Sequence, residues 1–322
     1  MPRGRRGSRY VVALGGNAIT PTGGTGTAEE QERTVAAAMA RLAPMVASGA
    51  ELVITHGNGP QIGNLMLKNE VAAHLVPPMP LDWCVAQTQA TIGLAIQTAL
   101  EWELRRLGVE RGVVAVLTRV VVDGDPAAMA WTKPIGRHLA EADARAASDS
   151  RHRFAPQADG SWRRVVPSPE PLAVVEEPQI RRLLESRAVV VAAGGGGVPV
   201  HEDAEGRYRG VEVVIDKDLT ASLLARSLRA DTLVILTDTE GATLDFGRPG
   251  QRVLGQIGAA GLRELQARGH FGAGSMGPKV EAALRFVEAG GARAVIASLD
   301  RAVEAVAGSA GTQIAGPGAV PV

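Results

Sequence analysis

Short apolar runs alternate with helical patterns along most of the 322-residue chain. Several runs are continuous and rich in β-branched residues, which is typical of parallel strands buried on both faces. This alternation predicts an α/β fold with helices on both faces of a parallel sheet. The expected strands are 10–14, 51–55, 113–117, 189–193, 232–236 and 294–297, and the expected helices are 28–47, 86–107, 179–185, 219–228 and 278–290.

The stretch from Arg119 to about Pro171 interrupts this alternation. It is rich in Pro, Asp, Arg and Ala, and it contains one charged helical pattern at 139–150. A structureless loop of this length is improbable in a compact domain. We therefore predict a small inserted subdomain, or lid, at about 119–171, which carries Lys133 on one arm and 163–169 on the other.

The charge balance and composition exclude several classes of protein. Lys+Arg and Asp+Glu both number 34, which argues against a general binder of nucleic acid or anionic membranes. No run approaches the ~18 apolar residues of a membrane helix. The basic segment 1–9 precedes an apolar run too short for a signal peptide, so we expect a disordered tail at 1–9 and one domain at 10–322. A single cysteine, Cys84, fits a reducing compartment, and we expect a cytoplasmic protein.

Lysine is rare among the basic residues. The chain has 30 Arg but only four Lys, at positions 68, 133, 217 and 279. Where Arg is favoured generally, lysines are candidates for positions that a planar guanidinium does not fit, such as the space beside a transferring phosphoryl group. On the count alone, chance explains the presence of any one lysine as well as such a functional position does. Lys133, Lys217 and Lys279 lie beside Gly, Pro or Asp at element boundaries, whereas Lys68 lies in a helical run and is expected on the surface.

Glycine-rich turns follow three of the predicted strands, at 15–16, 57–59 and 194–197. Ligands of open α/β sheets bind beyond the carboxyl ends of the strands. Glycine there lets backbone N–H groups approach an anion. Three such turns favour a phosphate-handling edge over plain turn chemistry. No G-x-G-x-x-G motif opens a helix after the first strand, so a dinucleotide site is disfavoured, and the histidines lack metal-ligand spacing.

Charged residues also stand at two predicted helix starts. Pro278 is expected at the first position of a helix whose N-terminus, with Lys279 in its first turn, can bind an anion. Lys217 lies between Asp216 and Asp218, where Asp218 either caps a helix or orders the lysines, unless the motif is simply a solvated surface. The segment 163–169 is either a solvated basic turn or an oxyanion clamp.

Eight segments together resemble the carbamate kinases of the amino acid kinase family. They are 12–18 (VALGGNA), 26–31 (GTAEEQ), 55–64 (THGNGPQIGN), 132–136 (TKPIG), 162–169 (WRRVVPSP), 193–200 (AGGGGVPV), 210–219 (GVEVVIDKDL) and 269–282 (GHFGAGSMGPKVEA). The likeness runs from about residue 9 to 314. The chain departs from the family pattern at Trp131, at 137–139 and at 87–92, which concern the subdomain and dimer packing.

The resemblance implies a three-layer αβα sandwich with a mostly parallel central sheet, a protruding inserted subdomain and a homodimer. It implies reversible phosphoryl transfer between carbamoyl phosphate and ADP, giving ATP and carbamate, with Mg²⁺. Two other functions stay open at this point. One is an amino acid kinase family enzyme that phosphorylates another small carboxylic acid, such as an acetylated amino acid. The other is a catalytically weak regulator that binds a nucleotide or carbamoyl phosphate.

Residue roles follow from the resemblance by position. The implied phosphate-site lysines are Lys133, Lys217 and Lys279, organised by Asp218. The implied turns around carbamate and the transferred phosphoryl group hold Gly15, Gly16, Asn17, Gly57, Asn58, Gly194, Gly195 and Gly196, and Arg164 reaches the substrate from the subdomain. The implied nucleotide side holds Asp238 and Met276 together with Lys279. The resemblance assigns no protein ligand to Mg²⁺.

Overall fold

A large central sheet organises the chain in a computed structural model that describes residues 7–21, 24, 26–123, 129, 131–149, 152–157, 160–246, 250–272 and 276–316. Within these residues the sheet has eight strands in the order β15-β17-β16-β12-β1-β2-β9-β3. They are β1 (Arg9–Leu14), β2 (Glu51–His56), β3 (Val113–Ala115), β9 (Val189–Val191), β12 (Thr232–Thr237), β15 (Gln256–Gly258), β16 (Arg293–Ser298) and β17 (Thr312–Ala315). Six strands run parallel, while β17 pairs antiparallel with β16 and parallel with β15. The mostly parallel sheet is confirmed, with all six predicted strands in it.

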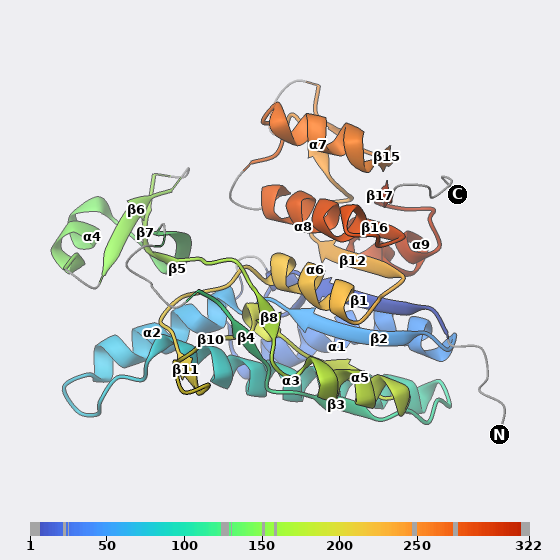
Figure 1. Ribbon diagram of the computed structural model, residues 1–322. Helices are drawn as coiled ribbons and strands as arrows, with labels where there is room; N and C mark the ends of the chain where they lie inside the picture. The colour runs from blue at the N-terminus through green and yellow to red at the C-terminus, as the bar shows by residue number, and fades with distance from the viewer. Residues whose placement is uncertain are drawn as a thin grey trace.

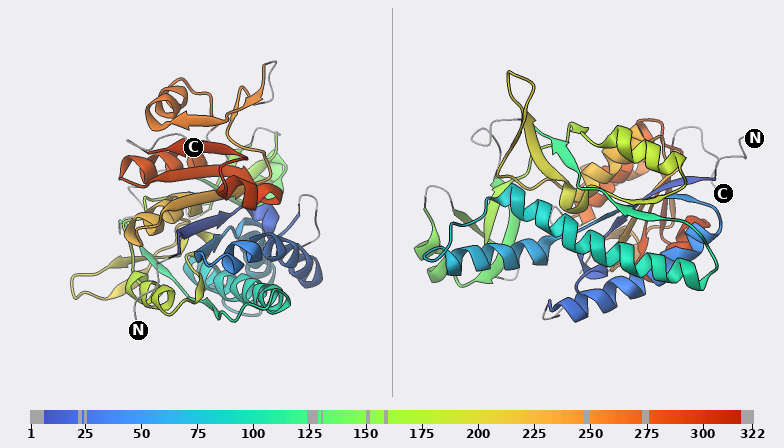
Figure 2. Two further views of the ribbon diagram at one scale, coloured as in Figure 1. Left: turned by 90° about the vertical axis from the view of Figure 1, so that its right-hand side faces the viewer. Right: turned by 90° about the horizontal axis from the view of Figure 1, so that it is seen from below.

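Helices cover both faces of this sheet, which makes the three-layer αβα sandwich that was predicted (Figures 1 and 2). One face carries α1 (Ala28–Ala47), α3 (Leu81–Arg106) and α9 (Ala302–Val306). The other carries α5 (Glu177–Glu185), α6 (Lys217–Ser227) and α8 (Met276–Glu288), with α7 (Ala259–Ala267) packed beside α8. Alternate residues of each strand enter opposite cores, as the two-residue period of a strand requires. In β1, Val12 and Leu14 face the first core, and Val11 and Ala13 face the second.

The interrupting stretch forms a separate antiparallel sheet that protrudes from the sandwich at the left of Figure 1. It consists of β5 (Trp131–Leu139), β7 (Trp162–Pro167) and β6 (Arg153–Pro156), with α4 (Glu141–Ala147). Ile135 and Val166 dock this subdomain onto α2 (Gly59–Ala72), where they meet Ile62 and Met66. The nine-residue β5 was not predicted as a strand. It contains Pro134 and Gly136, two residue types that are uncommon inside strands.

The protruding part is narrower than the predicted 119–171. The first residues of that range, and two residues just after its end, belong to a second, four-stranded sheet of order β11-β10-β4-β8. Its strands are β4 (Arg119–Val121), β8 (Ala173–Val174), β10 (Val198–Glu202) and β11 (Tyr208–Gly210). Because β4 pairs with both β8 and β10, it is tied to the body of the molecule, and the protruding sheet spans 131–167. A short hairpin of β13 (Thr243–Leu244) and β14 (Arg252–Val253) completes the described strands.

Arg9 belongs to the sheet and not to the predicted tail of 1–9. It is the first residue of β1, and its side chain is 6% exposed. Its Nε atom donates to Glu51 Oε2 at 2.7 Å, and its Nη1 atom donates to the Leu228 carbonyl oxygen. A buried guanidinium needs such partners, so the domain begins before Tyr10. Residues 1–6 lie outside the described residues.

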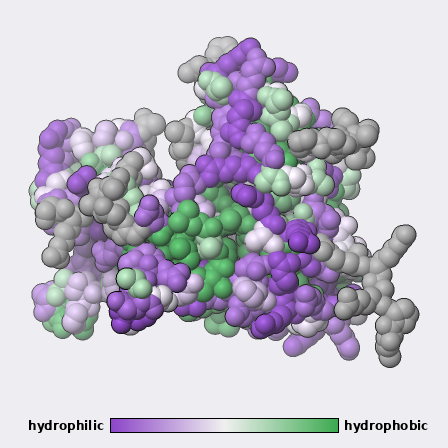
Figure 3. Space-filling view, viewed as in Figure 1, coloured by the Kyte–Doolittle hydropathy of each residue, from purple (hydrophilic) through white to green (hydrophobic). Residues whose placement is uncertain are grey.

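The surface carries one clear apolar area in the view of Figure 1. Hydrophobic residues gather near the centre of this face and are surrounded by hydrophilic ones (Figure 3). Leu172, which precedes β8, is an exposed hydrophobic residue.

Cys84 on α3 is buried and forms no disulfide. Among the described helices, none is both long enough and apolar enough to span a bilayer.

Candidate active site

The turns after β1, β2 and β12 meet at the carboxyl edge of the parallel sheet. Leu14 pairs in register with both His56 and Leu236, so the turns after β1, β2 and β12 begin at the same level. Gly15 N donates to Leu236 O at 2.9 Å, and Gly57 N donates to Leu14 O at 3.0 Å. The structure therefore brings together the turns that hold Gly15, Gly16, Gly57 and Asp238, at the edge where open α/β sheets bind ligands.

Gly57 lies close against the turn after β1. A Cβ atom added to it would lie 3.3 Å from Gly16 N and 3.6 Å from Lys217 Cδ. Only a residue without a side chain fits there unless its neighbours shift. The close approach also means that the stem of Lys217 passes directly beside the turns after β1 and β2.

Two lysines share one buried carboxylate at this edge. Lys217 begins α6, and its Nζ atom lies 2.6 Å from Asp218 Oδ1. Lys279 comes from the first turns of α8, and its Nζ atom lies 3.1 Å from Asp218 Oδ2. The Asp218 side chain is only 4% exposed. One carboxylate thus holds the ammonium group of its neighbour Lys217 and that of Lys279, which lies 61 residues further along the sequence from Asp218.

The charges of this cluster are strongly coupled. Burial alone raises the pKa of Asp218, but the ammonium groups of Lys217 and Lys279 outweigh it and hold that pKa at about 2. Burial lowers the pKa of Lys217, and the charge of Asp218 opposes this effect. With both lysines charged, two positive charges face one negative charge. A buried cluster with this imbalance favours an added anion.

Lys133 reaches the same helix start from the subdomain. Its Nζ atom lies 2.6 Å from Asp216 Oδ2. Asp216 is the N-cap of α6, and its Oδ1 atom accepts hydrogen bonds from Asp218 N and Leu219 N. The cap is therefore Asp216, and the alternative in which Asp218 caps the helix is wrong. Sequence reasoning assigned no role to Asp216, although it lies in the same charged motif.

The glycine turn after β9 packs tightly against the turn after β2. A Cβ atom on Gly194 would lie 2.2 Å from His56 Nε2, and one on Gly195 would lie 2.0 Å from Asn58 Nδ2. Gly195 also has a left-handed φ of 67°, which favours glycine. Gly196 approaches the Ile215 carbonyl just before α6. The run of glycines is thus required by close packing on three sides.

Three threonine hydroxyls fix this turn. They were not predicted, because threonine occurs in every kind of element and carries no local signal. Ala193 has a left-handed φ of 54°. Its carbonyl accepts from Thr55 Oγ1 at 2.8 Å, and its N–H donates to Thr118 Oγ1 at 3.0 Å. On α6, Thr220 Oγ1 donates to the Gly196 carbonyl at 2.9 Å. The turn is therefore held to β2, to the start of β4 and to α6.

The two predicted asparagines have different surroundings. Asn58 is 6% exposed, and its Nδ2 atom donates to Thr88 Oγ1 on α3 at 2.9 Å. Asn17 is exposed, and its Nδ2 atom lies 3.1 Å from Asp238 Oδ2. This contact joins the turn after β1 to the turn after β12.

Met276, the first described residue of α8, packs at the border of the core three residues before Lys279. Pro278 was predicted at the first position of this helix, but it is the third residue of α8.

Arg164 lies away from the lysine cluster. It stands opposite Ile135 in the β5–β7 pair, while Lys133 stands opposite Val166. Opposite residues share a face, so Arg164 and Lys133 are diagonal neighbours on one face of the subdomain. Arg164 lines a cavity of about 270 Å³ against α2, and burial lowers its pKa. Its Nε atom is buried and has no hydrogen-bond partner among the described residues.

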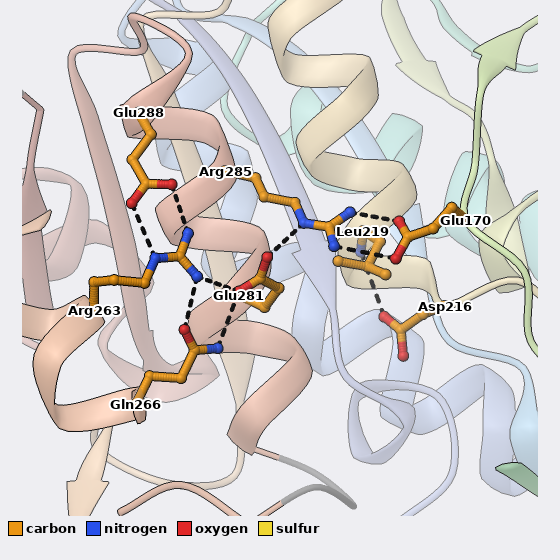
Figure 4. Close-up of polar contacts among 8 residues, drawn as sticks. All are labelled: Glu170, Asp216, Leu219, Arg263, Gln266, Glu281, Arg285 and Glu288. Atoms are coloured by element: carbon orange, nitrogen blue, oxygen red, sulfur yellow. Dashed lines mark hydrogen bonds and ion pairs between the residues drawn. The ribbon is translucent and has the colours of Figure 1, made fainter. Parts of the chain in front are cut away.

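An ion-pair network fixes α8, the helix that carries Lys279 (Figure 4). Arg285 binds both carboxylate oxygens of Glu170 and contacts Glu281 at 2.6 Å. Arg263 on α7 lies 2.6 Å from Glu281 and also binds Glu288. Glu170 lies between β7 and β8, so the network joins α7 and α8 to the segment that leaves the subdomain. Sequence reasoning missed it because exposed ion pairs leave no distinctive pattern.

Comparison with known proteins agrees with this geometry. The family model described as "Amino acid kinase family" matches residues 8–298. The carbamate kinase of Thermococcus kodakarensis is 47% identical over 311 residues, which cover 95% of this chain and 98% of that protein. Carbamate kinase 1 of Enterococcus faecium is 42% identical over 297 residues, or 91% and 94% of the two chains. The structure of Giardia lamblia carbamate kinase bound to AMP-PNP superposes with a TM-score of 0.89, 37% identity and coverage of 96% and 99%. The chain belongs to the amino acid kinase family.

Proposed function

We propose that the chain is a carbamate kinase, which transfers a phosphoryl group reversibly between carbamoyl phosphate and ADP to give ATP and carbamate. One observation carries the proposal: Asp218 holds Lys217 and Lys279 beside the glycine turns of the sheet edge. The relatives named above act as carbamate kinases, and they match nearly the full length of this chain. Together, these features favour phosphoryl transfer onto a small planar acid.

The cluster supplies positioning and charge in this reaction. Phosphoryl transfer depends mainly on aligning the two oxygens and on stabilising negative charge on the moving group. Lys217 and Lys279 provide that positive charge. With a pKa of about 2, Asp218 stays ionised at neutral pH and is too weak a base to accept a proton efficiently. Its role is therefore to orient the two ammonium groups and keep them charged.

The remaining roles follow from position. We assign the transferred phosphoryl group and carbamate to the wall formed by Gly15, Gly16, Gly57 and the turn 194–196. Asn17 joins this wall to Asp238, which we assign with Met276 to the nucleotide side. Lys133 approaches from the subdomain, and Arg164 lies on the same face of β5 and β7. A movement of the subdomain toward the sheet would bring Arg164 nearer to the substrate, as in other enzymes with lids.

We propose that Mg²⁺ arrives with the nucleotide. The part of the chain that the structure describes contains no grouping of three His, Cys, Asp or Glu side chains suited to a metal ion. Both carboxylates of the cluster are occupied, Asp218 by two lysines and Asp216 by Lys133 and the start of α6. Phosphate oxygens are preferred ligands of Mg²⁺. When bound, the ion would neutralise part of the phosphate charge.

We further propose a cytoplasmic homodimer. The outer side of α3 carries Leu94 and Trp102, both more than 60% exposed. They line a groove of about 990 Å³ between α1, α2 and α3. A second copy of the chain would remove this apolar surface from water. Light scattering coupled to size exclusion tests this assembly, and a monomer at micromolar concentration would contradict it.

The direct test of the function is ATP formation from ADP and carbamoyl phosphate with Mg²⁺. We expect turnover by the parent protein and its loss on removal of Mg²⁺ by a chelator. The reverse reaction should be measured with ATP and carbamate, and in parallel with N-acetylated amino acids. Preference for an acetylated acid would indicate the alternative kinase. Binding of nucleotide or carbamoyl phosphate without turnover would indicate a regulator.

A further inference from the structure

A buried histidine separates two of the turns that form the anion site. His56 is the last residue of β2 and is 1% exposed. Its Nδ1 atom lies 2.9 Å from the carbonyl oxygen of the next residue, Gly57. Its Nε2 atom faces Gly194, where an added Cβ atom would lie only 2.2 Å away. The imidazole therefore touches both the turn after β2 and the turn after β9.

We propose that His56 is a positioning residue, whose neutral imidazole holds the Gly57 and Gly194 turns at the separation required for phosphoryl transfer. The inference rests on the proposed function. It assigns a role to a histidine that lies outside the lysine cluster and takes no part in the charge balance of Asp218.

The hydrogen bond fixes the form of the ring. A carbonyl oxygen only accepts, so Nδ1 must carry the proton, and in the neutral ring Nε2 then carries none. Burial lowers the pKa of His56 to about 4, and the charge of Lys217 acts in the same direction. The ring is therefore uncharged at neutral pH. Because Nδ1 is engaged and Nε2 is covered by Gly194, the ring is poorly placed to exchange protons with a substrate.

Both contacts of the ring lead to Lys217. On one side, the Gly57 turn lies against Gly16 and against Lys217 Cδ. On the other, the turn that starts at Gly194 continues to Gly196, whose carbonyl accepts from Thr220 on α6. Lys217 is the first residue of that helix. A shift of the ring would thus move the walls of the anion site relative to the lysine that we assign to the phosphoryl group.

Substitutions at position 56 separate the hydrogen bond from simple packing. In His56→Asn, the side-chain amide can donate to the Gly57 carbonyl much as Nδ1 does. In His56→Leu, the donor is lost and an apolar side chain remains. We expect His56→Asn to keep kcat within about tenfold of the parent. We expect His56→Leu to lose on the order of 10²-fold in kcat, with KM for ADP changed less than threefold, because small misplacements can cost this much.

A substitution on the opposite side of the ring provides the second measurement. The backbone of Gly194 lies outside the left-handed region, so alanine is compatible with its conformation. The new Cβ atom of Gly194→Ala would collide with Nε2 and displace the ring. We expect a loss of kcat near that of His56→Leu. In the His56→Asn/Gly194→Ala double variant, the smaller amide leaves room for the methyl group, so part of kcat should return. Such non-additivity is diagnostic of direct contact.

The outcomes distinguish the two proposals. Thermal unfolding by circular dichroism, recorded for every variant, establishes that the protein assayed is folded. An inactive parent overturns the proposed function and this inference with it. An active parent with His56→Leu within threefold of its kcat, or with strictly additive losses in the double variant, overturns only the positioning role. If His56→Leu does not fold, the cycle of His56→Asn and Gly194→Ala decides the matter.

Discussion

Lys133 and Asp216 form an ion pair of 2.6 Å between Nζ and Oδ2 across 83 residues of sequence. The lysine belongs to the protruding subdomain, and the aspartate caps the helix that starts with Lys217. The pair therefore ties the subdomain to the start of α6. Because Asp216 uses one carboxylate oxygen for the cap and the other for Lys133, the two functions can be separated by substitution.

Asp216→Asn should remove the ion pair but keep the cap, since asparagine is as good an N-cap as aspartate. We expect a free energy of unfolding within about 1 kcal/mol of the parent, because Lys133 is one-third exposed and such pairs contribute little. Amide exchange in β5 and β7 should become faster. Asp216→Ala is the matched control and should lose about 1 kcal/mol more, measured by urea unfolding. Equal losses in the two variants would contradict this division of roles.

Asp218→Asn should lower kcat by about 10²–10³, since a neutral amide cannot keep two neighbouring ammonium groups charged and oriented. The pKa of Asp218 is lowered to about 2, so its charge stabilises the folded protein above pH 4, and this stabilisation is lost as the pH falls toward 2. The variant should therefore also lose roughly 2 kcal/mol at pH 7. Steady-state assays and urea unfolding measure both effects. Full specific activity in a destabilised variant would mean that Asp218 is structural.

The fold was predictable where one residue type dominated an element. Runs such as Val189–Val191 predict a buried strand, because a continuous run of β-branched residues is typical of parallel strands covered on both faces. The helix predicted at 86–107 begins at Leu81 in the structure, because it starts after Pro80 without a side-chain cap to signal its first residue. The β5 strand was missed because its proline and glycine are unusual in strands, and its pairing with β7 overrides their propensity.

The candidate site was predictable from the rarity of lysine and from the position of glycines directly after the predicted strands. Four lysines among 30 arginines, and glycines after parallel strands, are local features that a single sequence displays. Partners that meet through the fold are not local. The Thr118 contact to Ala193 spans 75 residues, and the Lys133 contact to Asp216 spans 83. Nothing in the sequence near either residue indicates its partner, so these contacts required the structure.

The stability of the protein should depend on His56 between pH 6.5 and 4. The folded pKa of His56 is about 4, compared with 6.5 for the unfolded group. Between pH 6.5 and 4 the imidazole is protonated in the unfolded chain but stays neutral in the folded protein. The free energy of unfolding therefore decreases as the pH is lowered through this window. The full effect is roughly 3 kcal/mol, and about 2 kcal/mol is expected by pH 5. Urea unfolding at pH 7.5 and 5 should show this loss in the parent and its absence in His56→Asn. Equal pH slopes in the two proteins would refute the expectation.

Lys217→Arg tests whether shape, and not only charge, matters at the cluster. Asp218 and the turn at Gly57 confine the side chain, whose Cδ atom would lie 3.6 Å from a Cβ on that glycine. A guanidinium is wider than an ammonium, and its donors lie in a fixed plane. It cannot occupy this space without moving the turn or leaving Asp218.

We therefore expect Lys217→Arg to lose about 10²–10³ in kcat, the typical effect of removing one preorganised donor, with little change in the KM for ADP. Lys68→Arg is the matched control, because Lys68 is exposed on α2, and it should keep the parent's kcat and KM. Both variants should be assayed under saturating carbamoyl phosphate and ADP. If Lys217→Arg kept kcat within threefold of the parent, the rarity of lysine in this chain would carry no information about phosphate contacts. A comparable loss in Lys68→Arg would point instead to a general intolerance of arginine, and the confinement of Lys217 by Gly57 would no longer explain the effect.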